Sequence, residues 1–155
     1  MHVASIDDIR TALTAAIKDR DVVATSALRS ALAAISTAER AGTEKRELSS
    51  EEIEAVLAKE VKRRDEAAEG FKAGGRDDRA ERELAERKIL AAYLPEPLGE
   101  AEIEAIVDEV LAEGAFSGVA SMGQAMRAVM ERLQGRADGK VVSGLVRARL
   151  SATDA

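Results

Sequence analysis

The sequence predicts an all-α protein, with an N-terminal bundle of four helices followed by a C-terminal three-helix unit. Apolar side chains recur at intervals of three and four residues along most of the chain, and this spacing places them on one face of an α-helix. Ser, Asp or Gly precedes several of these stretches, as is typical of helix N-termini. Pro95 and Pro97 interrupt the pattern, because neither residue can continue a helix. We therefore expect the bundle over residues 1–95 and the three-helix unit over residues 98–151.

The spacing of apolar residues predicts the first two helices. Ser5 can cap a helix over about residues 6–18, in which two aspartates give a negatively charged first turn. A second helix begins near Val23 and ends near Gly42. The inward residues expected for the first helix are Ile6, Ile9, Leu13 and Ile17.

Local signals mark the third and fourth helices. Ser49 and Glu52 fit a capping box, in which each side chain accepts a hydrogen bond from the backbone of the other residue. Gly74-Gly75 interrupts the third helix. A fourth helix can restart at Asp77 or Asp78 and end just before the two prolines.

Arg64 falls on the apolar stripe of the third helix, where a hydrophobic residue would be expected. A carboxylate of the fourth helix, Glu83 or Glu86, could pair with it. The structural interpretation is an interhelical ion pair, and the functional alternative is an anion-binding site. Arg63 belongs to another, basic face of the same helix, which is either a solvated surface or a nucleic-acid stripe.

Capping signals also mark the helices of the C-terminal unit. Gly99 is a weak cap for the fifth helix, with Glu102 at the other position of a capping box. Ser121 and Gln124 fit a capping box for the sixth helix, and Asp138 can cap the last one. The inward residues expected for the last helix are Val141, Val142, Leu145, Val146 and Leu150.

The composition argues against catalysis by the chain itself. There is no cysteine, and the only histidine, His2, lies at the chain end, which excludes histidine-based nucleophilic triads and metal sites built on cysteine or histidine. The glycine motifs that cradle phosphates are absent. We therefore expect no catalytic residue, no cofactor and no metal. The lack of a targeting or membrane-spanning pattern predicts a cytoplasmic protein with no membrane partner.

The distribution of charge indicates one candidate surface for nucleic acid. The net charge of −6 opposes indiscriminate nucleic-acid binding, yet residues 115–153 hold six basic and two acidic residues, a net charge of +4. Arg136 and Lys140 flank the start of the last helix, and Arg147 follows on the same face. Such a surface suits phosphate. The structural alternative is a soluble turn capped by Asp138, and both interpretations remain open.

Several motifs along the chain carry a family resemblance. They are Lys18-Asp19-Arg20-Asp21, Ala27-Leu28-Arg29, Lys62-Arg63-Arg64-Asp65, Gly75-Arg76, Tyr93-Leu94-Pro95, Met122-Gly123 with Met126, and Gly135-Arg136-Ala137-Asp138-Gly139-Lys140. With these residues the chain resembles the GatB/YqeY family over nearly its whole length. This family includes stand-alone YqeY-like proteins and the C-terminal portion of the GatB subunit of tRNA-dependent amidotransferases.

The resemblance implies an all-helical module that contacts tRNA. In GatB this region helps to hold the tRNA, whereas glutamine hydrolysis and amide formation belong to other domains. Carried over by the resemblance, Arg136 and Lys140 are the main RNA-binding candidates, and Arg63, Arg64 and Arg76 are further ones.

Three functions are consistent with the sequence, of which an intrinsic carbon–nitrogen ligase with glutamine as donor is the weakest. The first is a tRNA-binding accessory module associated with tRNA-dependent amidotransfer, in which partners carry out the carbon–nitrogen ligation with glutamine as amido donor. Its expected partners are tRNA and an amidotransferase or an aminoacyl-tRNA synthetase. The alternative is a helical adaptor that binds other proteins and no RNA.

Overall fold

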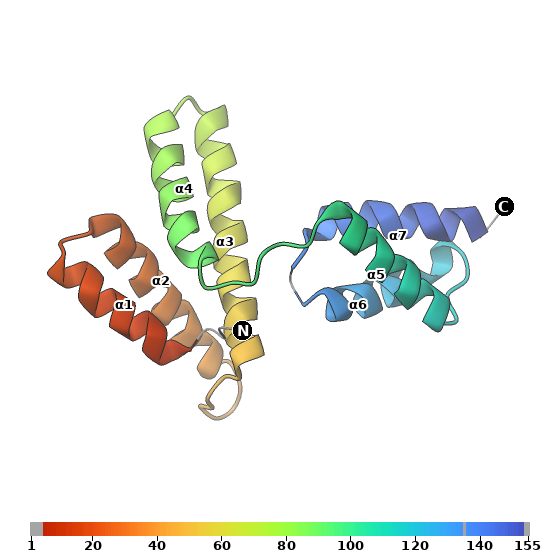
Figure 1. The fold of residues 1–155 in the computed structure, drawn as a ribbon, viewed down its shortest axis with the longest axis horizontal. Helices are drawn as coiled ribbons and strands as arrows, with labels where there is room; N and C mark the ends of the chain where they lie inside the picture. Colours follow the sequence, from red (N-terminus) through yellow and green to blue (C-terminus); the bar gives the residue numbers. More distant parts are fainter. Residues whose placement is uncertain (1–4, 135, 154–155) are drawn as a thin grey trace. The chain divides into compact units, whose positions relative to one another are not determined.

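The structure, a computed structural model, describes residues 5–134 and 136–153, and every regular element in this part is a helix, without a strand (Figure 1). This confirms the predicted all-α class. Its helices are α1 (Ile6–Lys18), α2 (Val22–Glu39), α3 (Ser50–Ala73), α4 (Asp77–Ala91), α5 (Glu100–Glu113), α6 (Met122–Leu133) and α7 (Gly139–Thr153), with a short 3-10 helix, η1 (Val119–Ser121), before α6. His2 and Gly135 lie outside the described residues.

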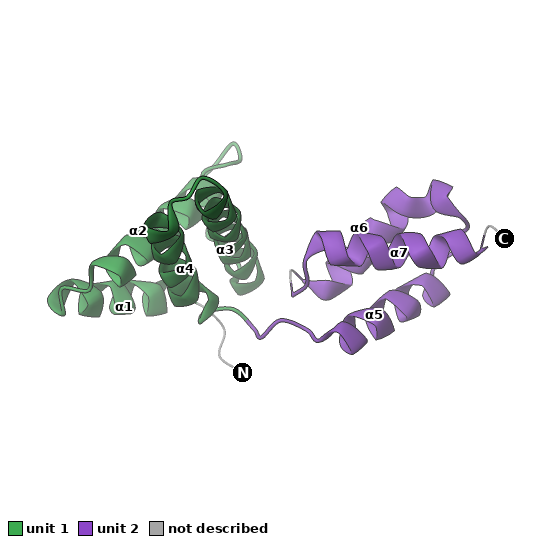
Figure 2. Ribbon diagram, turned by 90° about the horizontal axis from the view of Figure 1, so that it is seen from above, with its two compact units in different colours: residues 1–94 green, residues 95–155 purple. Residues whose placement is uncertain are grey.

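The chain divides into two compact units, residues 1–94 and residues 95–155, shown in green and purple in Figure 2. We call them unit 1 and unit 2. Unit 1 contains α1 to α4, and unit 2 contains α5 to α7. In the described part of either unit, no helix has the length and apolar character needed to cross a membrane.

Unit 1 consists of two helical hairpins, α1–α2 and α3–α4, and α2 packs against the three other helices. The buried positions of α2 include several alanines, whose small side chains let neighbouring helices approach closely. The core of unit 1 is therefore aliphatic and centred on α2. Its buried residues include Ile9, Ala27, Leu28, Ala31, Ile35, Ile53, Leu57 and Leu90.

The predicted helix starts in unit 1 are confirmed where local chemistry defines them. The Ser5 hydroxyl accepts the Asp8 amide hydrogen bond at 3.1 Å. The Ser49 hydroxyl accepts the Glu52 amide at 3.2 Å, and the Glu52 carboxylate accepts the Ser49 amide at 2.8 Å, which completes the capping box. One inward residue was predicted wrongly, because Ile17 lies in the last turn of α1 and is 49% exposed.

Unit 2 is a three-helix arrangement in which α5, α6 and α7 all contact one another. The predicted cap of the last helix is confirmed, because the Asp138 carboxylate accepts the Lys140 amide at 2.9 Å. At the start of α5, the Glu102 carboxylate accepts the Gly99 amide at 2.9 Å. The buried core residues of unit 2 are Ile103, Val107, Val110, Ala125, Val129, Leu133, Val142, Val146 and Leu150.

Two sequence predictions for unit 2 are wrong. Ser121 does not cap α6, because its hydroxyl instead accepts the Ser117 amide at 3.1 Å and donates to the Ser117 carbonyl at 3.0 Å. These bonds hold the turn that leads into η1. Val141 is not an inward residue of α7, since half of its surface is exposed, at 50%. The buried stripe of α7 begins one residue later, at Val142.

Candidate functional site

Lys140 and Arg147 lie on one face of α7. They are seven positions apart in the chain, nearly two helical turns, so their side chains project in almost the same direction. Both residues are exposed, and neither forms an ion pair with another described residue. Ser143 and Gly144 lie between them on this face. We call the surface made by Lys140, Ser143, Gly144 and Arg147 the α7 face.

Arg136 precedes this face and makes a different kind of contact. Its Nε and Nη2 atoms donate hydrogen bonds to the Glu96 carbonyl at 3.3 and 3.1 Å. The Leu98 amide in turn donates to the Arg136 carbonyl at 3.1 Å. Arg136 therefore ties the segment before α5 to the turn between α6 and α7. Part of its hydrogen-bonding capacity is already used within unit 2.

The acidic residues of α5 neutralise two of the arginines that follow them in the chain. Arg132 of α6 lies 2.8 Å from the Glu113 carboxylate. Arg149 of α7 lies 2.9 Å from the Asp108 carboxylate and 3.5 Å from that of Glu104. The hydrogen bond to Asp108 is the main reason that the pKa of Arg149 is raised. Hence the positive segment identified in the sequence faces carboxylates of the same unit.

The ion pairs leave few cations in unit 2 for a ligand. Residues 95–153 hold six basic and nine acidic residues, a net charge of −3. Among the described residues, three cations of unit 2 form neither an ion pair nor the carbonyl contact of Arg136, namely Arg127, Lys140 and Arg147. Two of these three, Lys140 and Arg147, belong to the α7 face.

The two exposed candidates in unit 1 do not form a common surface. The Arg63 side chain is 79% exposed and its Nη1 atom lies 3.8 Å from the Glu60 carboxylate. Arg76 lies between α3 and α4, 3.6 Å from Asp78. About 15 Å of helix separates position 63 from the end of α3. These arginines therefore occupy separate parts of the α3–α4 hairpin.

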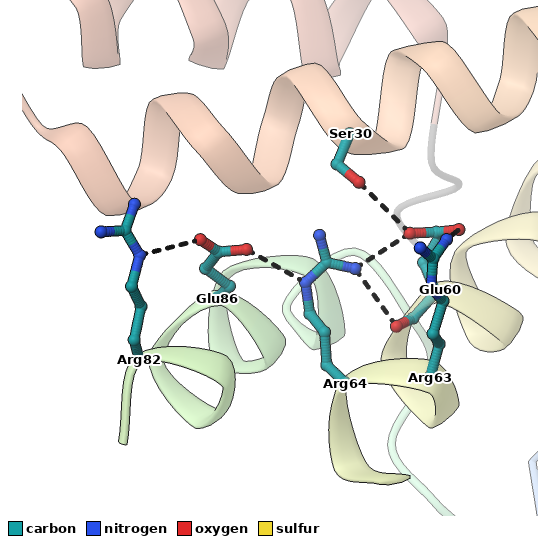
Figure 3. Close-up of polar contacts among 6 residues, drawn as sticks. All are labelled: Ser30, Glu60, Arg63, Arg64, Arg82 and Glu86. Carbon is teal, nitrogen blue, oxygen red and sulfur yellow. Dashed lines mark hydrogen bonds and ion pairs between the residues drawn. The ribbon is translucent and has the colours of Figure 1, made fainter. Parts of the chain in front are cut away.

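Arg64, the third candidate in unit 1, is buried between α3 and α4 (Figure 3). Its Nε atom donates to the Glu86 carboxylate at 3.3 Å, and its Nη1 atom donates to the Glu60 carboxylate at 2.9 Å. This confirms the interhelical pair expected with Glu83 or Glu86. Only 6% of Arg64 is exposed, so its guanidinium is enclosed in the packing of unit 1.

The sequence did not reveal the full network around Arg64. The Ser30 hydroxyl of α2 donates to the Glu60 carboxylate at 3.3 Å, and Arg82 lies 3.5 Å from the Glu86 carboxylate (Figure 3). The network thus joins three helices. A serine in the middle of an alanine-rich helix carries no sequence signal for such a role, whereas an arginine on an apolar stripe does.

Comparison with known proteins identifies a matching family and two similar proteins. The model of the family described as Yqey-like protein matches residues 6–150. A glutamyl-tRNA(Gln) amidotransferase subunit of Thermococcus gammatolerans is 44% identical over 57 residues, which covers 34% of this chain and 9% of the relative. Altered inheritance of mitochondria protein 41, mitochondrial, of Pyrenophora tritici-repentis is 35% identical over 91 residues, 57% of this chain and 50% of that protein. The chain thus spans at most half the length of these relatives.

Proposed function

Since this chain belongs to the Yqey-like protein family, we propose that it is a tRNA-binding accessory module for tRNA-dependent amidotransfer. The amide chemistry, a carbon–nitrogen ligation with glutamine as donor, belongs in this proposal to a partner enzyme. The similarity to an amidotransferase subunit named for glutamyl-tRNA(Gln) supports it. The observation that carries the tRNA contact is the α7 face, where Lys140 and Arg147 are exposed and without ion pairs among the described residues.

The charge of the chain defines the kind of binding proposed. Aromatic residues make up 2% of the sequence and the net charge is −6, so base stacking and strong long-range attraction both contribute little. The α7 face is suited to phosphate groups of a folded RNA, whose shape selects the binding position. Binding is therefore weak and sensitive to salt.

A direct test measures the binding of deacylated tRNA to the full chain by fluorescence anisotropy at several salt concentrations. Reversing both charges of the α7 face, Lys140→Glu with Arg147→Glu, is expected to abolish binding. A matched control, Arg40→Glu with Lys45→Glu, reverses two exposed cations of unit 1 and should bind as the unchanged protein does. Circular dichroism should be the same for all three, because these side chains lie outside the cores.

The alanine variants give a quantitative form of the same test. Each phosphate contact that is lost should reduce the slope of log K against log salt by about 0.7 to 0.9, so Lys140→Ala with Arg147→Ala should reduce it by about 1.4 to 1.8. Variants Arg63→Ala and Arg76→Ala show whether unit 1 contributes. If the affinity and the slope survive all of these changes, the adaptor function is the better explanation.

A further inference from the structure

A groove of about 500 Å³ lies at the turn between α1 and α2 in unit 1. Figure 1 shows this turn at the end of the first hairpin. Two aliphatic side chains in the groove are unusually accessible, with Ile17 49% and Val22 66% exposed. Single exposed aliphatic residues are common, but two that share one hollow form a patch that water solvates poorly. The lining residues are Ile17, Arg20, Val22, Thr25, Ser26 and Arg29.

Arginines supply the charge of this groove. Arg20 and Arg29 both line it, and neither forms an ion pair with another described residue. Asp19 and Asp21 are adjacent in sequence but do not line the groove. The Asp21 carboxylate accepts the Ala24 amide at 3.0 Å and caps α2. The groove is therefore lined by two aliphatic side chains and two arginines, and an arginine guanidinium can bind a carboxylate through two hydrogen bonds.

The unusual backbone conformation of Arg20 is a further indication that its side chain takes part in binding at the groove. Arg20 has φ 58°, a left-handed conformation that favours glycine. Its amide donates to the Ile17 carbonyl at 3.1 Å, and the Asp21 amide donates to the Ala16 carbonyl at 2.9 Å. This is the Schellman pattern, whose left-handed position is usually glycine. An arginine here lowers stability relative to glycine and places a guanidinium at the groove.

We propose that this groove docks an acidic, amphipathic segment of a partner protein. One or two aliphatic side chains of that segment would contact Ile17 and Val22, and its carboxylates would bind Arg20 and Arg29. Charge complementarity selects this occupant, since an RNA phosphate would gain nothing from the two aliphatic side chains of the groove. The proposal concerns unit 1 and does not depend on tRNA binding by the α7 face.

The test begins with a displayed library of random 12-residue peptides selected on the full chain. Enriched sequences should combine Asp or Glu with Leu, Ile or Phe. A synthetic peptide of the enriched sequence is then titrated into isotope-labelled protein by NMR. The amide resonances that shift should belong to the groove, including those of Val22, Thr25 and Ser26.

Substitutions in the groove should weaken this peptide while the protein stays folded. Arg29→Ala and Arg20→Gly should each reduce affinity about tenfold, the loss expected for one charge-assisted contact. Arg20→Gly should also raise the melting temperature, because glycine adopts the left-handed backbone conformation at this position without strain. Val22→Asp should abolish binding without unfolding α2, since an acidic residue is favourable in the first turn of a helix. Arg10→Ala and Arg40→Ala, exposed cations outside the groove, should bind normally.

Other outcomes would overturn the proposal. One is a selection that enriches no peptides with acidic and apolar residues. Another is a peptide that binds the Arg20→Gly and Arg29→Ala variants as tightly as the unchanged protein. A third is a shift of the groove resonances on dilution, which would show that two copies of the chain associate there. Shifts of the same resonances with tRNA instead of peptide would assign the groove to RNA. The Lys140→Glu and Arg147→Glu variant should bind the peptide normally, which separates this proposal from the tRNA-binding function.

Discussion

Arg64 of α3 and Glu86 of α4 form a buried ion pair, with the Nε and Oε2 atoms 3.3 Å apart and only 6% and 8% of the two residues exposed. Glu60 lies on the other side of the guanidinium, 2.9 Å from its Nη1 atom (Figure 3). Two carboxylates thus share one buried cation. Burying such groups is costly, so the network is better explained as fixing the register of α3 on α4 than as a large source of stability.

We expect Arg64→Met to lower the free energy of unfolding of unit 1 by about 3 to 5 kcal/mol, because Glu60 and Glu86 lose their buried cation and keep only the longer ion pairs with the exposed Arg63 and Arg82. Urea denaturation followed by circular dichroism measures this loss. As a control, Arg82→Met removes a cation whose side chain is 56% exposed, and it should cost at most about 1 kcal/mol.

The triple variant Glu60→Leu, Arg64→Met and Glu86→Leu tests the explanation. It removes every charge at the centre of the network, so it should recover most of the stability lost in Arg64→Met. A triple variant as unstable as the single one would show that the shape of these side chains matters more than their charges.

The pKa of Glu52 provides a pH-dependent prediction. Hydrogen bonds from the Arg46 guanidinium and from the Ser49 amide to the Glu52 carboxylate lower the pKa of Glu52 from 4.5 to about 2. Since the folded pKa is the lower one, ionised Glu52 stabilises the folded state above pH 4.5, and this contribution is lost as the pH falls towards 2.

NMR titration of the Glu52 carboxyl carbon should therefore have its midpoint near pH 2. Arg46→Ala should raise the midpoint part of the way towards the ordinary value, because the Ser49 amide bond remains. Since both side chains are exposed to solvent, salt near 1 M should also raise it. The variant Arg40→Ala is the control, and a midpoint that Arg46→Ala leaves unchanged would contradict the assigned cause.

Gly114 ends α5 at a point where a side chain has no room. A Cβ atom there would overlap the ring of Phe116, which packs against the core of unit 2. We expect Gly114→Ala to destabilise unit 2 by about 1 to 3 kcal/mol, as overpacking does. Thermal denaturation measures this, with Gly144→Ala as control. Gly144 lies in α7 with nothing within 4 Å of an added Cβ atom, so that variant should be stabilised by up to about 1 kcal/mol.

Features of the fold that depend on neighbouring residues were predictable from the sequence. Ser49 and Glu52 are three residues apart, so their capping box follows from helix geometry alone. Arg64 on an apolar stripe required a carboxylate from the next helix, and Glu86 supplies it. The Ser121 box failed because Gly118, with φ 66°, turns the chain before η1. There the Ser121 hydroxyl bonds to Ser117 and is not free to cap α6.

Features that depend on how helices pack were not predictable. The sequence showed an acidic α5 and basic residues after it, but the pairing of Arg149 with Asp108 depends on how α7 lies against α5. The α1–α2 groove was missed for a similar reason. Ile17 fits the apolar stripe of α1, yet it is exposed beside Val22 in the last turn, whereas Ala16 of the same turn is buried.

The contact between Arg136 and Glu96 gives a final prediction about the segment before α5. The Arg136 guanidinium donates two hydrogen bonds to the Glu96 carbonyl, and a contact of this kind at a partly exposed site contributes about 1 kcal/mol. Arg136→Ala should therefore raise hydrogen exchange of the Leu98 amide about fivefold, the factor that about 1 kcal/mol gives. Limited proteolysis within residues 95–99, which we expect to be the first region cut, should accelerate similarly. Lys140→Ala should change neither rate, because no hydrogen bond or ion pair links the Lys140 side chain to a described residue of this segment. If Arg136→Ala also changes neither, the guanidinium does not hold the segment and is available to bind phosphate beside the α7 face.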